Sequence, residues 1–203
     1  MKLLLTSTGL FNKNIRDKFI ELFAKNFFKV KVLFIVSAAE SPEEKWYVRQ
    51  SKEELLELGI KEDNFVIYHK GEKPSKDVLD SIDLIYVCGG NTFHLLEELQ
   101  KSGLDKDLIE MIKNGIFYIG ASAGSIIVTP NIKIAEPWDP NDRKIKDLNG
   151  LGLVDFTVSP HYTEREDATA KNLEDELGIE VKRITDNQAI LVNGNEIELL
   201  WKY

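Results

Sequence analysis

The sequence of 203 residues has one cysteine, three histidines and fewer basic than acidic residues. The single cysteine, Cys88, excludes an internal disulfide and a cysteine-rich zinc site. The histidines are far apart, at positions 69, 94 and 161, so we expect no metal and no cofactor. The 26 basic and 34 acidic residues give a net charge of −8, which argues against general nucleic-acid binding.

Long apolar runs are also missing. No stretch approaches the roughly 18 apolar residues of a membrane span, so we expect no membrane partner. The first seven residues form too short an apolar run for a signal peptide and include no small-residue cleavage site. We therefore expect a cytoplasmic protein. Its length fits one domain, 1–203, and its composition of 43% hydrophobic and 30% charged residues is that of a globular chain.

Short apolar runs alternate with amphipathic stretches along the chain. Five runs are apolar nearly throughout instead of alternating, as strands covered on both faces are. They are residues 2–6, 31–36, 64–68, 83–87 and 116–119. Helical spacing or capping signals occupy residues 15–27, 41–58, 91–103, 108–115 and 163–178. This alternation predicts an α/β fold, in which helices cover both faces of a parallel sheet.

The second half of the chain departs from this pattern. Residues 129–150 contain three of the six prolines and predict a long irregular excursion, which in compact domains is often functional. Short apolar runs follow at 153–158, 181–184, 189–192 and 196–201. Asn193-Gly194 between the last two predicts a C-terminal hairpin.

The most informative stretch is Gly120-Ala121-Ser122-Ala123-Gly124, directly after the fifth predicted strand. A Gly-x-Ser-x-Gly sequence between a strand and a helix is typical of a nucleophile elbow, where a tight turn exposes the serine. The following N–H groups and the helix N-terminus would stabilise a developing oxyanion. Ser122 is therefore the candidate nucleophile.

A nucleophilic serine needs a base, and histidine is the usual one. His161 follows the apolar run 153–158, at the end of a predicted strand, where open α/β sheets bind ligands. His69 lies in a predicted loop, and His94 lies in the first turn of a predicted helix, which disfavours a protonated ring. We choose His161 as the base, with His94 a distant second.

Two further groups complete such a site. The base needs an orienting carboxylate, for which Asp186, Glu136 and Asp139 are candidates that the sequence alone does not rank. A second oxyanion donor is expected from the turn Gly89–Thr92, which allows close approach of backbone N–H groups. The turn matches neither the dinucleotide-binding motif nor a Walker loop.

Three blocks together resemble the aspartyl dipeptidase (peptidase E) family of serine peptidases. They are Cys88-Gly89-Gly90-Asn91-Thr92-Phe93, Tyr118-Ile119-Gly120-Ala121-Ser122-Ala123-Gly124 and Pro160-His161-Tyr162. The resemblance implies a three-layer, doubly wound, mostly parallel sheet like that of class I glutamine amidotransferases, with serine at the elbow instead of cysteine. It also implies hydrolysis of dipeptides with an N-terminal aspartate. Separately, we expect a monomer or homodimer whose partner is a small peptide substrate.

The resemblance assigns roles to particular residues. Ser122 matches the nucleophile and His161 the base, and Gly90 and Ala123 match the oxyanion-hole donors. An acidic residue in a later turn completes the family triad, and Asp186 lies there.

An alternative acid and candidate substrate contacts also follow from the sequence. Glu136 is the alternative acid, because an aspartate in the loop after the elbow has been considered in the family, and Glu136, which departs from that residue type, is the nearest carboxylate here. We name Asn91, Thr92 and Arg165 as candidate substrate-binding residues. Arg165 and Arg143 are the candidate partners of the substrate's aspartate side chain.

Three other interpretations stay open. An α/β-hydrolase esterase would place its acid between Ser122 and His161, where several aspartates lie. The Gly-Gly-Asn-Thr-Phe block counts against it, since those enzymes have a different oxyanion motif earlier in the chain. A non-catalytic, amidotransferase-like binding domain is the second alternative, and a relative of cyanophycin-degrading peptidases is the third.

Overall fold

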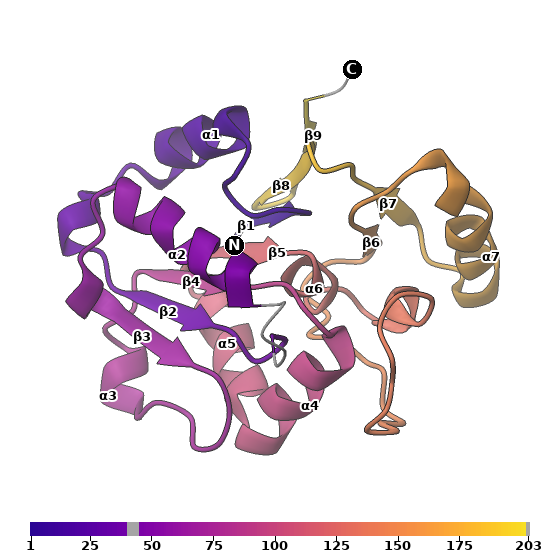
Figure 1. Ribbon diagram of the computed structural model, residues 1–203, viewed down its shortest axis with the longest axis horizontal. Helices are drawn as coiled ribbons and strands as arrows, with labels where there is room; N and C mark the ends of the chain where they lie inside the picture. The colour runs from indigo at the N-terminus through magenta and orange to yellow at the C-terminus, as the bar shows by residue number, and fades with distance from the viewer. Residues whose placement is uncertain (40–44, 202–203) are drawn as a thin grey trace.

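A mostly parallel sheet forms the centre of the molecule, and the computed structural model describes residues 1–39 and 45–201. Its strands are β1 (Lys2–Thr6), β2 (Val32–Ile35), β3 (Phe65–Tyr68), β4 (Leu84–Val87), β5 (Phe117–Ala121), β8 (Ala189–Asn193) and β9 (Glu196–Leu200). Their order is β3–β2–β4–β5–β1–β8–β9 (Figure 1). The first five strands in this order are parallel. The hairpin extends the sheet, with β8 antiparallel to β1 and β9 antiparallel to β8.

Helices cover both faces of this sheet (Figure 1). They are α1 (Lys13–Phe23), α2 (Lys45–Glu57), α3 (Lys76–Leu79), α4 (Thr92–Ser102), α5 (Leu104–Lys113), α6 (Ala123–Ile126) and α7 (Asp167–Leu177). Successive strand residues point to opposite faces. Phe34 and Tyr86 therefore pack in the core with α1 and α2, whereas Leu33 and Ile85 pack in the core with α4 and α5.

A second, smaller sheet lies at the right of Figure 1, on the side of the molecule away from β2 and β3. It pairs β6 (Thr157–Ser159) with β7 (Val181–Arg183) in parallel, and α7 connects the two strands (Figure 1). The predicted capping box is present, because the Thr163 N–H donates to the Glu166 carboxylate and the Glu166 N–H bonds back to Thr163. The helix that follows ends at Gly178, as predicted.

The fold prediction is confirmed as a three-layer, doubly wound, mostly parallel sheet with a short C-terminal hairpin. The single-turn helix α3 was not predicted. The predicted helix start at 41–44 lies outside the described residues. Within the ranges that the structure describes, no helix is both long enough and apolar enough to cross a membrane.

Candidate active site

Ser122 lies at a sharp turn between β5 and α6, with φ 50° and ψ −110°. Such a backbone conformation is strained for a residue with a side chain, and strain of this kind is typical of a nucleophile elbow. The flanking glycines are required by close contacts. A Cβ atom on Gly120 would lie 2.5 Å from the carbonyl oxygen of Gly124, and one on Gly124 would lie 2.4 Å from that of Val87.

The elbow is tied to the neighbouring strand β1. The Ser122 N–H donates to the Thr6 carbonyl at 2.9 Å, and the buried Ser125 hydroxyl donates to the same oxygen at 2.7 Å. These bonds offset the strain of the turn. Helix α6 is only one turn long, so its macrodipole is small, and an anion bound here would depend on individual N–H groups.

His161 stands just beyond the end of β6 and also has a positive φ, of 54°. Its backbone N–H donates to the Ser7 hydroxyl at 3.0 Å, which ties it to the end of β1. Its ring Nδ1 lies 2.7 Å from Oδ1 of Asp186. Asp186 sits in the turn before β8, and its carbonyl accepts a hydrogen bond from the Thr8 hydroxyl. Three chain segments therefore meet around the imidazole.

The Gly89–Gly90 turn faces the elbow from the end of β4. Gly90 has φ 126°, and a Cβ there would lie 2.2 Å from the Ala38 carbonyl oxygen, so only glycine fits. Across the described ranges, no hydrogen bond uses the N–H of Gly90 or that of Ala123. Both N–H groups are therefore available to a substrate oxygen.

Two cavities adjoin these groups and share Ser122, Asp139 and His161. The larger has a volume of about 570 Å³ and is also lined by Ser7, Thr8, Phe11, Trp46, Tyr47, Gln50, Ser51, Gly89, Gly90 and Ala121. The smaller has a volume of about 200 Å³ and is also lined by Ile126, Ile134, Ala135, Trp138, Ser159, Pro160 and Glu166. A bound peptide that crosses Ser122 would extend into both.

The predicted excursion 129–150 supplies part of both walls through Asp139. The Asp139 Oδ2 atom accepts a hydrogen bond from the Thr92 N–H at 2.8 Å. The carbonyl of Pro140 accepts one from the Asn91 side chain at 2.9 Å. The excursion is thereby fixed to the first turn of α4, next to the Gly89–Gly90 turn.

The three candidate carboxylates have separate surroundings. Asp186 contacts the imidazole, and Asp139 lines both cavities. Glu136 is exposed and lines a different hollow, together with Leu173 and Glu176. The structure therefore brings Asp186, and not Glu136, to the ring of His161.

The candidate substrate-binding residues lie at the edge of this arrangement. Asn91 caps α4 by accepting the His94 N–H at 3.0 Å, and Thr92 is fully buried. Arg143 forms ion pairs with Glu97 and Glu98, each at 2.7 Å. Arg165 is exposed and lines neither cavity.

A sequence model of peptidase family S51 matches residues 3–200. The chain belongs to this family. An uncharacterized peptidase of Listeria monocytogenes is 36% identical to this S51 peptidase over 192 residues, which cover 91% of this chain and 92% of that protein. Peptidase E of Salmonella arizonae is 36% identical over 120 residues, 58% of this chain and 48% of that protein.

Solved structures agree with this assignment. A crystal structure from Listeria monocytogenes EGD-e, named for peptidase E, superposes on the S51 peptidase with a TM-score of 0.79 at 32% identity, covering 98% of this chain and 96% of that one. A peptidase from an acI-B1 actinobacterium has a TM-score of 0.72 at 20% identity, covers 99% of this chain and 87% of that one, and shows the fold alone. The predicted family is thereby confirmed.

Other reactive groups of this S51 peptidase lie outside the two cavities. Cys88 is fully buried at the end of β4, and burial raises the pKa of its thiol, so it is no nucleophile at neutral pH. His94 is buried in α4, and its Nε2 lies 2.6 Å from Asp142. His69 lines neither cavity. Among residues 1–39 and 45–201, no group of three His, Cys, Asp or Glu side chains could hold a metal ion.

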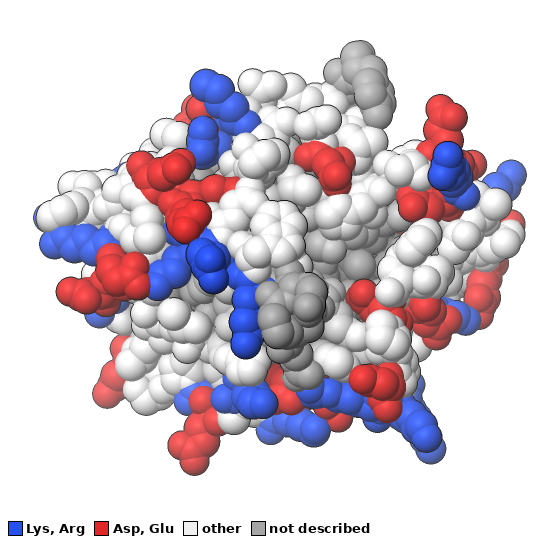
Figure 2. All heavy atoms as spheres, viewed as in Figure 1, with Lys and Arg blue, Asp and Glu red and all other residues white. Residues whose placement is uncertain are grey.

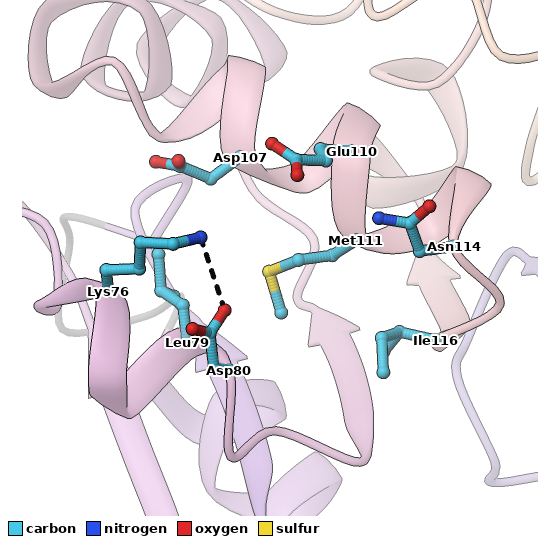
Figure 3. A pocket seen from close by; sticks show the side chains of 8 residues that line it. All are labelled: Lys76, Leu79, Asp80, Asp107, Glu110, Met111, Asn114 and Ile116. Carbon is cyan, nitrogen blue, oxygen red and sulfur yellow. Dashed lines mark hydrogen bonds and ion pairs between the residues drawn. The ribbon is translucent and has the colours of Figure 1, made fainter.

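Another hollow of the S51 peptidase lies between α3 and α5 (Figure 3). Its carboxylates belong to Asp80, Asp107 and Glu110, and Lys76 pairs with Asp80 at 3.5 Å (Figure 3). Asp107 pairs with Lys73. The described lining contains neither a serine nor a histidine, so this hollow offers no serine nucleophile with a histidine base. On the face seen in Figure 2, charges of both signs are mixed around the edges.

Sequence reasoning missed several residues of the larger cavity in this S51 peptidase. Gln50 and Ser51 come from α2, and Ser7 comes from the end of β1. Their place depends on how α2 packs over the sheet, which no local pattern encodes. Ser7 could have been predicted from the sequence, because it follows the first predicted strand and the carboxyl end of a parallel strand is a usual ligand-binding position.

Proposed function

We propose that this peptidase is a serine peptidase that cleaves dipeptides with an N-terminal aspartate through an acyl-enzyme. One observation carries the proposal: the Nδ1 atom of His161 is held by Asp186 beside a cavity that also contains the strained Ser122. Similarity to proteins named peptidase E supports the substrate class.

The contact with Asp186 determines which ring nitrogen of His161 reacts. Because Nδ1 is held by the carboxylate, Nε2 is the atom that takes the proton of the Ser122 hydroxyl. The described residues show no hydrogen bond between the Ser122 hydroxyl and the imidazole. Such catalytic contacts are often long without substrate and shorten in the Michaelis complex.

The reaction then has two steps. The Ser122 oxygen attacks the peptide carbonyl, and the N–H groups of Gly90 and Ala123 hold the oxyanion, each donor being worth roughly 3 kcal/mol in comparable sites. His161 returns its proton to the leaving amine as the peptide bond breaks. Water, activated by the same imidazole, hydrolyses the ester on Ser122.

The charges of the cavities bear on the substrate. Asp139 is an acceptor for the α-ammonium of the peptide, beside the nucleophile. No Lys or Arg is among the described residues that line either cavity, and the sequence of residues 40–44 contains none. An aspartate side chain would therefore be held by hydroxyl and backbone donors. We expect a preference for Asp over Asn of only about tenfold, because neutral donors give less energy than an ion pair.

A dipeptide panel tests the proposal. Asp-Leu, Asn-Leu, Ala-Leu and Leu-Leu are compared with a simple ester, for the wild type and for Ser122→Ala. We expect Asp-Leu to be cleaved fastest and Ser122→Ala to be inactive but folded. Activity in Ser122→Ala would overturn the nucleophile assignment. Turnover of the ester alone would favour an esterase, and no turnover at all a binding domain.

A further inference from the structure

One face of α2 runs from the larger cavity into the interior. Tyr47, Gln50 and Ser51 follow helical spacing and line the cavity. Glu54 is the next residue on this face and is only 6% exposed. A buried carboxylate therefore lies directly behind the cavity wall, outside the catalytic groups described above.

Two hydrogen bonds hold the Glu54 carboxylate. Oε1 accepts from Nε2 of Gln50 at 3.1 Å, and Oε2 accepts from the Leu10 N–H at 3.2 Å. An ionised carboxylate only accepts, so the nitrogen of the Gln50 amide must face Glu54. Because the amide nitrogen is used in this hydrogen bond, the amide oxygen of Gln50 is the atom that can face the cavity.

Burial raises the pKa of Glu54 and of two neighbouring side chains. Burial raises the pKa of Glu54 to about 7, opposed by the hydrogen bonds from Gln50 and Leu10 and by the charge of Arg16, and helped by Glu57. On the β4 side, burial also raises the pKa of Tyr86 and of Cys88, so both stay uncharged at neutral pH.

This carboxylate costs stability at neutral pH. Its pKa in the folded state is raised above the ordinary value of 4.5. Its contribution to stability is therefore fully present below pH 4.5 and is lost as the pH rises through about 7. Glutamine, which is neutral and nearly the same shape, would avoid that cost. A group that destabilises the fold next to a reactive cavity is expected to serve the site.

We propose that Gln50 is a specificity-determining residue whose amide oxygen accepts a hydrogen bond from the α-ammonium of the peptide, and that Glu54 is the positioning residue that fixes this orientation. The inference rests on the proposed peptidase function. An ammonium has three N–H donors, so it can use Asp139 and Gln50 together. The buried charge of Glu54 behind the amide strengthens the attraction for a cation. The site therefore selects peptides with a free N-terminus.

The same pair gives a pH effect on binding. When Glu54 is protonated, its hydroxyl can donate to the Gln50 oxygen, and the amide can turn its nitrogen to the cavity. Affinity for a free ammonium then falls below pH 7.

The test compares Glu54→Gln and Gln50→Met with the control Glu53→Gln, an exposed glutamate on the same helix. Substrates are Asp-Leu and its N-acetyl derivative. We expect KM for Asp-Leu to rise about tenfold in both variants with kcat within about threefold, and the selectivity over the acetylated peptide to fall about tenfold. Glu53→Gln should match the wild type. Glu54→Gln should also raise Tm at pH 8.

The outcomes separate this inference from the proposed function. Equal losses for free and acetylated peptides would mean that Glu54 acts only on the structure, and unchanged selectivity would overturn the inference outright. If Glu54→Gln fails to fold, Gln50→Met decides alone. Binding of Asp-Leu, measured by calorimetry in a Ser122→Ala background at pH 6 and 8, does not require hydrolysis. A loss of affinity there on Glu54→Gln would support the inference even for a chain that cleaves no peptide.

Discussion

The molecule contains two histidine–aspartate pairs that differ in the ring nitrogen they use. His161 contacts Asp186 through Nδ1 at 2.7 Å, and His94 contacts Asp142 through Nε2 at 2.6 Å. The side chain of His161 is 48% exposed and lies beside Ser122, whereas that of His94 is 11% exposed. A short contact between these two residue types therefore says little about function by itself.

The backbone explains the difference between the pairs. The positive φ of His161 and its bond to the Ser7 hydroxyl hold the residue near the end of β1, where it lines both cavities together with Ser122. His94 belongs to the first turn of α4, and its ring reaches the excursion instead. We propose that the His161 pair serves proton transfer, whereas the His94 pair connects α4 to the excursion.

The sharpest way to break this comparison is to remove each imidazole in turn. We expect His161→Gln to lower kcat by about 10²- to 10⁴-fold, because the serine loses its base. His94→Gln should stay within about threefold of the wild type. Steady-state kinetics on Asp-Leu, with circular dichroism as the folding control, measure both. A larger loss in His94→Gln would reverse the assignment.

The carboxylates give the next largest effect. Asp186→Asn removes the charge that orients His161, and we expect kcat to fall about 10- to 100-fold. This is less than for a buried triad acid, because the Asp186 side chain is 61% exposed and water can replace part of its role. Asp142→Asn and Glu136→Gln should change kcat less than threefold. A greater loss with Glu136→Gln would move the triad acid into the excursion.

Local signals explain what the sequence could predict. The strand before Ser122, the glycines around it and the Thr163 cap are each encoded within a few residues, and the structure contains all of them. The hairpin at Asn193-Gly194 is another such case. The contact of His161 with Asp186 spans 25 residues, and the sequence left it as one of three choices.

Contacts between distant segments explain the rest. Nothing near Glu54 or Gln50 in the sequence indicates that α2 packs beside the elbow. The pairing of β6 with β7 in a separate sheet was also hidden, since strand partners depend on the whole topology. Arg165 lies in the short 3₁₀ turn before α7, where its side chain is exposed. The sequence predicted a capping box for this segment, but not the direction of the Arg165 side chain.

The third effect concerns stability. His94→Gln should lower the free energy of unfolding by about 1 kcal/mol, because a buried ring loses a hydrogen bond to a carboxylate. Urea denaturation measures it. His161→Gln should change stability less, since its partner is solvated. Equal losses of unfolding free energy in the two variants would show that both pairs are structural, and this would contradict the proposed role of His161.

The smallest effect is expected at acid pH. The hydrogen bond from His94 lowers the pKa of Asp142 below its ordinary value of 3.8, helped by the nearby charge of Arg143. A carboxylate with a lowered folded-state pKa contributes stability that is present above the ordinary value and is lost as the pH falls through the lowered one. Asp142→Asn should therefore reduce Tm slightly at pH 6 and flatten its fall below pH 3.8. Thermal melts from pH 2 to 6 measure this. A melt profile of Asp142→Asn parallel to that of the wild type would mean that the His94 pair contributes no charge-dependent stability, and that its role is geometric.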